Sequence, residues 1–251
     1  MSGLDQPRRL LFDRRSEVAR FLRWALEAEA NDWDLRWRAR PDLEASRRAA
    51  EAFEEQWWGV VVYSCFMSEI GTSAVAPHFR EPIPAEAAEE ILASMTLPHG
   101  AVKFHRIQSS GHTGAKTALV SACRHADSFS AILLRTGSFH ERYSALGGLR
   151  AGQWGRTTRY DLVLRAGALG LGGHFYEPDR AYLGESTGPR KGFAAIFGVP
   201  VTRKNADACE AVLREWTAAW HEVAKEAGVR WTGEPFVAGD FENALCIYQE
   251  K

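Results

Sequence analysis

Residues 149–167 read LRAGQWGRTTRYDLVLRAG. Gly152 and Gly155 stand on either side of Trp154, just before a run with helical periodicity. Glycine permits positive φ and lets another backbone approach closely. The first N–H groups of a helix have no partner within it, and the helix dipole favours an anion there. The stretch therefore predicts two helices joined by a glycine turn, the second beginning at about Arg156 and suited to bind an anion such as a DNA phosphate.

Helical periodicity extends over nearly the whole chain, because apolar residues recur every three or four positions in most segments. The run VVVY at 60–63 alone would also fit a strand, but its continuous helical context favours a central, buried helix. No hairpin signal and no internal repeat is present. The sequence therefore predicts an all-α fold of roughly ten helices. These helices are expected at 16–38, 43–70, 83–95, 114–126, 128–134, 138–148, 156–169, 188–198, 205–228 and 239–251.

The composition is that of an ordinary globular protein, with 251 residues, 45% hydrophobic residues and a net charge of −1. No apolar run approaches the roughly 18 residues that a membrane span needs, and the N-terminus has no apolar signal core. The four cysteines are far apart, which indicates reduced thiols and argues against structural zinc or an iron–sulfur cluster. We therefore expect a cytoplasmic protein, monomeric, without a metal, a cofactor or a membrane partner.

The segment SSGHTGAKT, residues 109–117, faintly suggests a phosphate-binding P-loop. That motif needs four residues between its first glycine and a Gly-Lys-Ser/Thr, whereas only two residues separate Gly111 from Gly114. Ala115 also stands directly before Lys116. We therefore expect a loop that leads into a helix, and no nucleoside triphosphate site.

The order of these segments resembles that of the helix-hairpin-helix DNA glycosylase superfamily, whose hairpin has the form Leu-Pro-Gly-Val-Gly-Arg-Lys-Thr-Ala. The likeness covers about residues 50–200, and here the hairpin has one extra residue and no proline. Similar places are filled by Leu149, Gly152, Gly155, Arg156 and Thr158. The resemblance implies a glycosylase-like helical bundle at 46–251 after an N-terminal helical extension at 1–45. The extension is rich in arginine and tryptophan, and its expected role is either outer packing or contact with DNA.

A divergent branch of that superfamily is more similar still, namely the α-glutamyl/putrescinyl thymine pyrophosphorylase-like proteins and phage-defence glycosylases. The segments that carry this likeness are YDLVLRAGALGL (160–171), YLGESTGPRKGFAAIFG (182–198) and ENALCIYQEK (242–251). The resemblance implies an enzyme that flips out and excises a modified base, such as a glucosylated hydroxymethylcytosine, from phage DNA. Three alternatives stay open: a pyrophosphorylase or transferase acting on hypermodified thymine in DNA, a DNA-binding module without catalysis, and an all-α protein unrelated to DNA, which the hairpin disfavours.

Three carboxylates are candidates for catalysis, since a carboxylate near C1′ stabilises the charge that develops when an N-glycosidic bond breaks. Asp161 is the first, because it lies one helical turn beyond the family's lysine position; its alternative role is an i,i+4 ion pair with Arg165. Asp179 fits the family's catalytic aspartate loosely, with a helix cap as alternative. Glu242 is the third, and a solvated helix position is its alternative.

The DNA contacts are expected at the hairpin and at one further helix start. In family members that also cut the DNA backbone, a lysine forms a Schiff base with the sugar; here Thr157 occupies that position. The resemblance therefore implies a monofunctional enzyme that leaves an abasic site. Arg190 and Lys191 are expected to contact phosphate, and the alternative role of Lys191 is to supply the Schiff-base amine that Thr157 lacks. Trp154 either wedges against the strand or packs under the turn. The expected DNA-binding set is Gly152, Trp154, Gly155, Arg156, Thr157, Thr158, Arg190 and Lys191.

Overall fold

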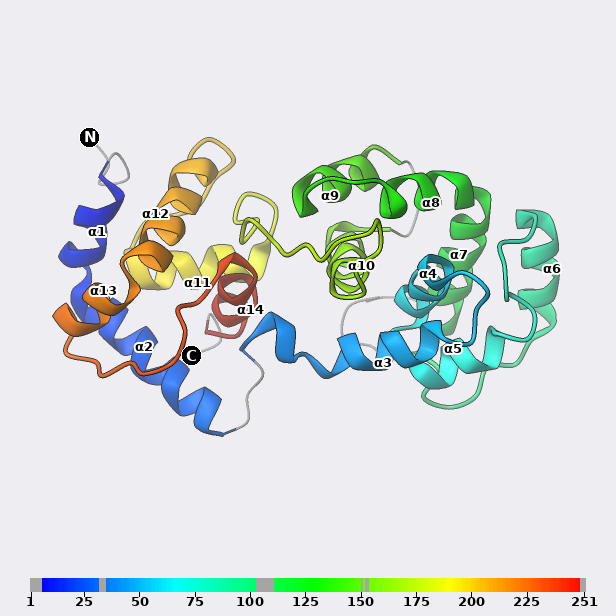
Figure 1. Cartoon of the computed structure of the whole chain (residues 1–251), viewed down its shortest axis with the longest axis horizontal. Helices are drawn as coiled ribbons and strands as arrows, with labels where there is room; N and C mark the ends of the chain where they lie inside the picture. The colour runs from blue at the N-terminus through cyan, green and yellow to red at the C-terminus, as the bar shows by residue number, and fades with distance from the viewer. Residues whose placement is uncertain (1–5, 32–34, 103–110, 150, 152–153, 249–251) are drawn as a thin grey trace. The chain divides into compact units, whose positions relative to one another are not determined.

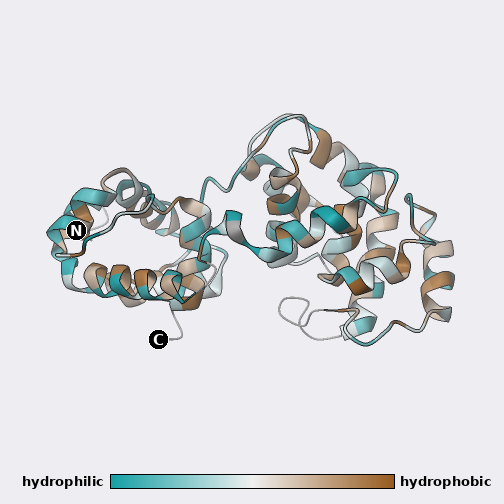
Figure 2. Cartoon of the chain, turned by 60° about the horizontal axis from the view of Figure 1, so that its bottom comes forward, coloured by the Kyte–Doolittle hydropathy of each residue, from teal (hydrophilic) through white to brown (hydrophobic). Residues whose placement is uncertain are grey.

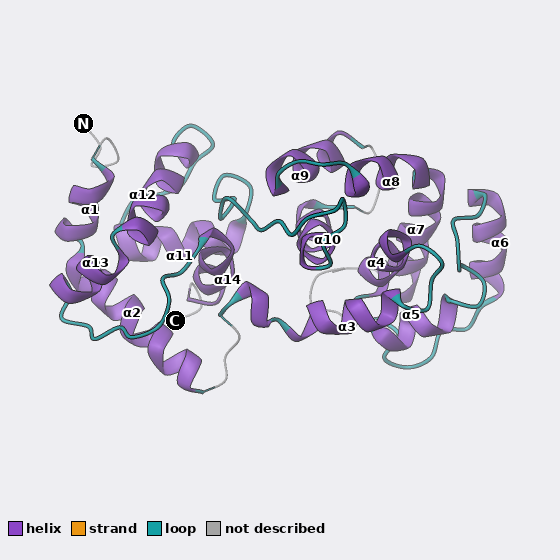
Figure 3. Ribbon diagram, viewed as in Figure 1, coloured by secondary structure: helices purple, strands orange, loops and turns teal. Residues whose placement is uncertain are grey.

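A computed structural model describes residues 6–31, 35–102, 111–149, 151 and 154–248. Within these ranges the regular structure is entirely helical (Figure 3), which confirms the predicted all-α class. The 60–63 run lies in a helix, as its context indicated. Teal and brown alternate along most of the helices in Figure 2, as expected where one face of a helix is buried and the other is solvated. None of the described helices is both long and apolar enough to cross a bilayer.

The chain divides into two compact units (Figure 1). Pro41–Glu177 form the first, which we call the central unit because it takes the middle of the sequence. Met1–Arg40 and Pro178–Lys251 together form the second, the terminal unit. This division differs from the expected domains at 1–45 and 46–251. The reason is that the N-terminal helices bury their apolar faces against helices from the last third of the chain.

The central unit is built around one helix that is buried on all sides. Helix α4 spans Gln56–Phe66, and every residue from Trp57 to Phe66 is buried. It contacts α3, α5, α7, α8 and α10. The close approach to α3 requires Gly59, because a Cβ there would lie 2.6 Å from the Cα of Ala50. The helices of this unit are α3 (Pro41–Ala50), α4, α5 (Glu69–Val75), α6 (Ala85–Ser94), α7 (Gly111–Arg124), α8 (Ala126–Leu134), α9 (Phe139–Gly148) and α10 (Arg156–Ala168).

The terminal unit holds an aromatic core shared by both ends of the chain. Phe21 on α2 lies against Trp216 on α12, with ring centroids 5.4 Å apart. Helices α11 and α14 pack closely because Gly192 leaves no room for a side chain beside the carbonyl oxygen of Leu245. The N-terminal extension is therefore part of this core. The helices are α1 (Pro7–Asp13), α2 (Arg15–Ala30), the 3₁₀ turn η2 (Trp37–Ala39), α11 (Thr187–Phe197), α12 (Ala206–Ala218), α13 (Trp220–Glu226) and α14 (Ala238–Tyr248).

Three segments predicted as single long helices are shorter or interrupted. The predicted 16–38 helix ends at Ala30, and the 3₁₀ turn η2 follows at Trp37–Ala39. The predicted 43–70 helix is three helices, because α3 ends at Ala50 and α4 ends at Phe66, just before Met67, whose φ of 55° is left-handed. The predicted 205–228 helix breaks at Ala219, which separates α12 from α13. Apolar residues recur on either side of each interruption, so periodicity by itself does not predict where these helices end.

Candidate functional site

The predicted helical hairpin is formed by α9 and α10 in the central unit, which contact each other directly. Helix α9 begins with a capping box in which Ser138 and Glu141 bind each other's backbone N–H groups. Helix α10 begins at Arg156, as predicted, with Gly155 as its N-cap residue. Gly155 has φ −66° and ψ 174°, so the left-handed conformation expected of this glycine is not adopted. Gly152 lies outside the described residues.

The start of α10 is open. No side chain caps it, and the first backbone bond into the helix runs from Arg159 N–H to the Gly155 carbonyl, so the preceding N–H groups have no intrahelical acceptor. A Cβ placed on Gly155 would meet no atom within 4 Å. Arg156 and Thr157 are half-buried, whereas Thr158 is buried and points into the unit. No side chain binds the first backbone N–H groups of α10 as a cap, and a helix start of this kind suits an anion.

Two roles were predicted for Trp154, a wedge against the strand or packing under the turn, and the structure shows packing. Its side chain is only 6% exposed. Its indole N–H donates to the Ala118 carbonyl oxygen at 3.3 Å, and its ring lies 4.8 Å from that of Phe129. Trp154 therefore supports the turn from beneath and does not reach outward to a bound strand.

Asp161 is placed inside the central unit, with 1% of its surface exposed. The ion pair of Arg165 is with Asp42 of α3, at 2.7 Å, whereas the sequence suggested Asp161 as its partner. Arg165 also donates to the Ser64 hydroxyl at 3.1 Å. Asp161 is therefore buried and does not form the predicted ion pair with Arg165, whereas its predicted catalytic role stays a prediction.

Asp179 is exposed and lies at the beginning of the second segment of the terminal unit. It is not part of a helix, and the following helix, α11, begins at Thr187 with Ser186 as its N-cap. The helix-cap alternative is therefore wrong. Of the three candidate carboxylates, Asp179 is the only one that faces solvent, because Glu242 in α14 is buried as well. The solvated position weighed for Glu242 is not observed.

The chain just after Asp179 is held rigidly by Glu210 of α12. The buried Glu210 carboxylate accepts hydrogen bonds from the backbone N–H of Ala181 at 3.0 Å and of Leu183 at 2.7 Å. Between them, Tyr182 has a φ of 54°, a conformation that costs a non-glycine residue free energy. Sequence analysis missed Glu210, because nothing in an amphipathic helix marks which of its acidic residues binds a distant backbone.

A pH dependence follows from this carboxylate. Burial raises the pKa of Glu210 above its ordinary value of 4.5, against the opposing effect of the two N–H donors. The native state then binds a proton more readily than the unfolded chain, so the free energy of unfolding falls as pH rises above about 4.5. We expect Glu210→Gln to make this slope shallower in urea unfolding measured between pH 4.5 and 7. Equal slopes for the two proteins would contradict the assignment.

Arg190 and Lys191 lie in the first turns of α11, the former half-buried and the latter exposed. Among the described residues neither side chain has an ion-pair partner. Arg180, just after Asp179, lies 3.5 Å from Asp207. The terminal unit therefore carries an exposed carboxylate and two accessible cations within a short span of sequence.

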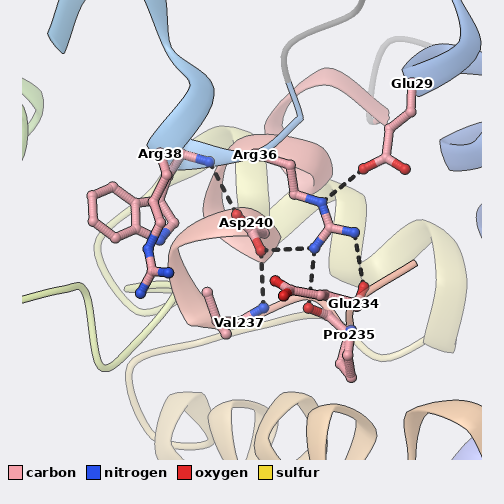
Figure 4. A pocket seen from close by; sticks show the side chains of 8 residues that line it. Glu29, Arg36, Arg38, Glu234, Pro235, Val237 and Asp240 are labelled. Atoms are coloured by element: carbon pink, nitrogen blue, oxygen red, sulfur yellow. Dashed lines mark hydrogen bonds and ion pairs between the residues drawn. The ribbon is translucent and has the colours of Figure 1, made fainter. Parts of the chain in front are cut away.

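A cavity of about 390 Å³ in the terminal unit was not predicted (Figure 4). Its wall is organised by Arg36, which pairs with Glu29 at 2.8 Å and Asp240 at 3.2 Å and donates to two backbone carbonyl oxygens. Asp240 also accepts hydrogen bonds from the backbone N–H of Trp37 and Val237. These charges are engaged with one another, so the cluster fastens η2 to α14. The lining residues are Glu29, Arg36, Trp37, Arg38, Glu234, Pro235, Val237 and Asp240.

The P-loop-like segment has a structural explanation. Gly111, Gly114 and Lys116 all lie within α7. The Lys116 ammonium donates to the carbonyl oxygens of Leu92 and Met95, each at 2.6 Å, and so satisfies the end of α6. The four cysteines are free thiols, and the described residues contain no cluster of ligands suited to a metal ion.

No protein-family model matches the chain, and neither a curated protein nor a solved structure matches it. The likeness to the helix-hairpin-helix glycosylases therefore stays a prediction from the sequence. In the described part of its hairpin, α10 begins without a side-chain cap, and Trp154 is buried just before it.

Proposed function

We propose that this chain is a DNA glycosylase that flips a modified base out of phage DNA and excises it, leaving an abasic site. The observation that carries the proposal is the start of α10, which has no side-chain cap and has the exposed Gly155 as its N-cap residue. Phosphate is a natural ligand for such a helix start. The order of motifs shared with the glycosylases supports DNA as the source of that phosphate.

Asp179 is the carboxylate to which we assign the chemistry. Hydrolysis of an N-glycosidic bond builds positive charge on the sugar, so the stabilising carboxylate must reach the substrate. Asp179 is exposed, whereas Asp161 and Glu242 are buried. The chain that follows it is fixed by Glu210, which suits a side chain that must be held in one orientation. Arg190 and Lys191 then serve as phosphate contacts.

The reaction leaves the DNA backbone intact in this proposal. A glycosylase that cuts the strand uses an amine to form a Schiff base, and Thr157 has none. Asp179 instead stabilises the sugar cation or activates a water molecule. The strand therefore breaks only when the abasic product is later treated with alkali.

Release of a free base tests the proposal. The protein is incubated with genomic DNAs that carry unmodified cytosine, hydroxymethylcytosine, glucosylated hydroxymethylcytosine or hypermodified thymine. We expect abasic sites in one modified DNA and the matching free base in its supernatant, identified by mass spectrometry. A base that changes mass but stays in the DNA would instead identify a transferase. Binding with no chemistry on any of these DNAs would leave only the DNA-binding module.

A further inference from the structure

The cavity of about 390 Å³ in the terminal unit has in its wall a guanidinium whose edges are almost fully bonded (Figure 4). Arg36 donates from Nε to Glu29 at 2.8 Å and from one terminal nitrogen to Asp240 at 3.2 Å. Its two terminal nitrogens also donate to the backbone carbonyl oxygens of Pro235 at 3.0 Å and Glu234 at 2.8 Å. Four of the five N–H donors of this side chain therefore have acceptors.

The flat face of the same guanidinium has a partner as well. The Cζ atom of Arg36 lies 4.4 Å from the centre of the Phe236 ring, and this ring is fully buried. A cation over an aromatic face is attracted by the quadrupole of the ring, more strongly where water is excluded. We call the Phe236 ring, the Glu29 and Asp240 carboxylates and the two carbonyl oxygens the guanidinium cage.

The cage suits the shape of a guanidinium and not only a positive charge. A guanidinium holds its donors in one rigid plane and stacks on aromatic rings, whereas an ammonium is a compact, strongly hydrated charge with three donors. An ammonium in the cage therefore leaves at least one of the four acceptors unpaired. Since Asp240 is buried, an occupant that fits its carboxylate poorly is disfavoured.

The cage can be reached from solvent. The side chains of Arg36 and Glu29 are 24% and 29% exposed. The cavity beside them is lined by three carboxylates and two guanidinium groups, so its net charge is negative, which favours a cationic compound. Its volume lies within the range of about 300–1,000 Å³ that is typical of small-molecule sites.

The Arg36 side chain is not the only contact that holds its segment on α14. The backbone N–H of Trp37 donates to Asp240 at 3.0 Å. The Trp37 ring packs against Gly239, because a Cβ on this glycine would lie 2.7 Å from its Cδ1 atom. The Arg36 side chain can therefore leave the cage while η2 stays in place.

We propose that the guanidinium cage is a binding site for small alkylguanidinium compounds, which replace the Arg36 side chain as its occupant. Arg36 is then a built-in competitor, and it lowers the apparent affinity for the external compound by the fraction of molecules in which the cage is free. The proposal does not depend on what the start of α10 binds, because every residue of the cage belongs to the terminal unit.

Titration with N-ethylguanidinium, followed by the backbone amide NMR signals of Trp37 and Val237, tests the proposal. Both N–H groups donate to Asp240, so their signals report on the cage. We expect a saturable shift in the wild type and binding about 10- to 1,000-fold tighter in Arg36→Ala, since a minor state with a free cage makes up about 0.1–10% of molecules. Ethylammonium at the same concentrations should give no saturable shift.

Two comparisons separate binding in the cage from general attraction to carboxylates. Arg9→Ala removes an exposed arginine of the same unit and should bind N-ethylguanidinium like the wild type. Equal affinity of the wild type and Arg36→Ala, or equal shifts with ethylammonium, would overturn the proposal. If Arg36→Ala does not fold, the wild type decides alone, and the lack of a saturable shift specific to N-ethylguanidinium then contradicts the proposal.

Discussion

Asp179→Asn is expected to lower the single-turnover rate of base release by about 10²- to 10⁴-fold, the range that a positioned acid or base contributes. The change keeps the size of the side chain but removes the charge that stabilises the sugar cation. Since Asp179 is exposed and lies outside the helices, we expect no loss of fold. The measurement is single-turnover excision on the DNA that the wild type attacks, with unfolding in urea measured alongside.

Two further variants make this result decisive. Asp207→Asn changes another exposed aspartate of the terminal unit and should excise at the wild-type rate. Asp161→Asn changes the buried carboxylate of the central unit. It should lower the free energy of unfolding and have less effect on the excision rate per folded molecule. A wild-type rate in Asp179→Asn, together with a large loss in folded Asp161→Asn, would transfer the catalytic role to Asp161.

Asp42→Ala is expected to destabilise the central unit by about 3–5 kcal/mol, because it leaves a buried guanidinium without its counter-charge. Arg165 has no exposed side-chain surface, and the Asp42 carboxylate lies 2.7 Å from it. The free energy of unfolding from urea titration measures the loss. Glu89→Ala, at an exposed position of α6, should change it by less than about 0.5 kcal/mol.

The double variant Asp42→Leu with Arg165→Met distinguishes the contribution of the ion pair to stability from that of the other contacts made by these side chains. Both charges are then gone, so no buried ion is left unpaired, and the protein should be more stable than Asp42→Ala. If the double variant is less stable than Asp42→Ala, the guanidinium is retained for its hydrogen bonds to Ser64 and the neighbouring Met67 sulfur and not for its charge.

Local patterns predicted much of the helical structure. The beginning of α10 at Arg156, the burial of α4 and the all-α class follow from periodicity and from the glycine before the helix. Each of these depends on side chains a few positions apart in one segment. The breaks at Met67 and Ala219 were missed, because helical periodicity continues on both sides of each break.

The candidate site was predicted less well, because burial and hydrogen bonds between distant segments leave no local pattern in the sequence. The sequence ranked Asp161 ahead of Asp179, but Asp161 is buried and Asp179 faces water. Glu210 was not singled out, although it holds the segment after Asp179 from 27 and 29 positions away. A hydrogen bond across that separation exists only when α12 packs against the non-helical segment that holds Ala181 and Leu183, so local spacing contains no trace of it.

By itself, then, the sequence determined that the chain is helical, where α10 begins and that the hairpin has no amine at Thr157. The tertiary structure alone decided that the two ends of the chain share one core, that Arg165 pairs with Asp42, and that Trp154 supports the turn from beneath. Helix formation depends on hydrogen bonds between neighbours in the chain, whereas burial and charge pairing depend on residues that only folding brings together.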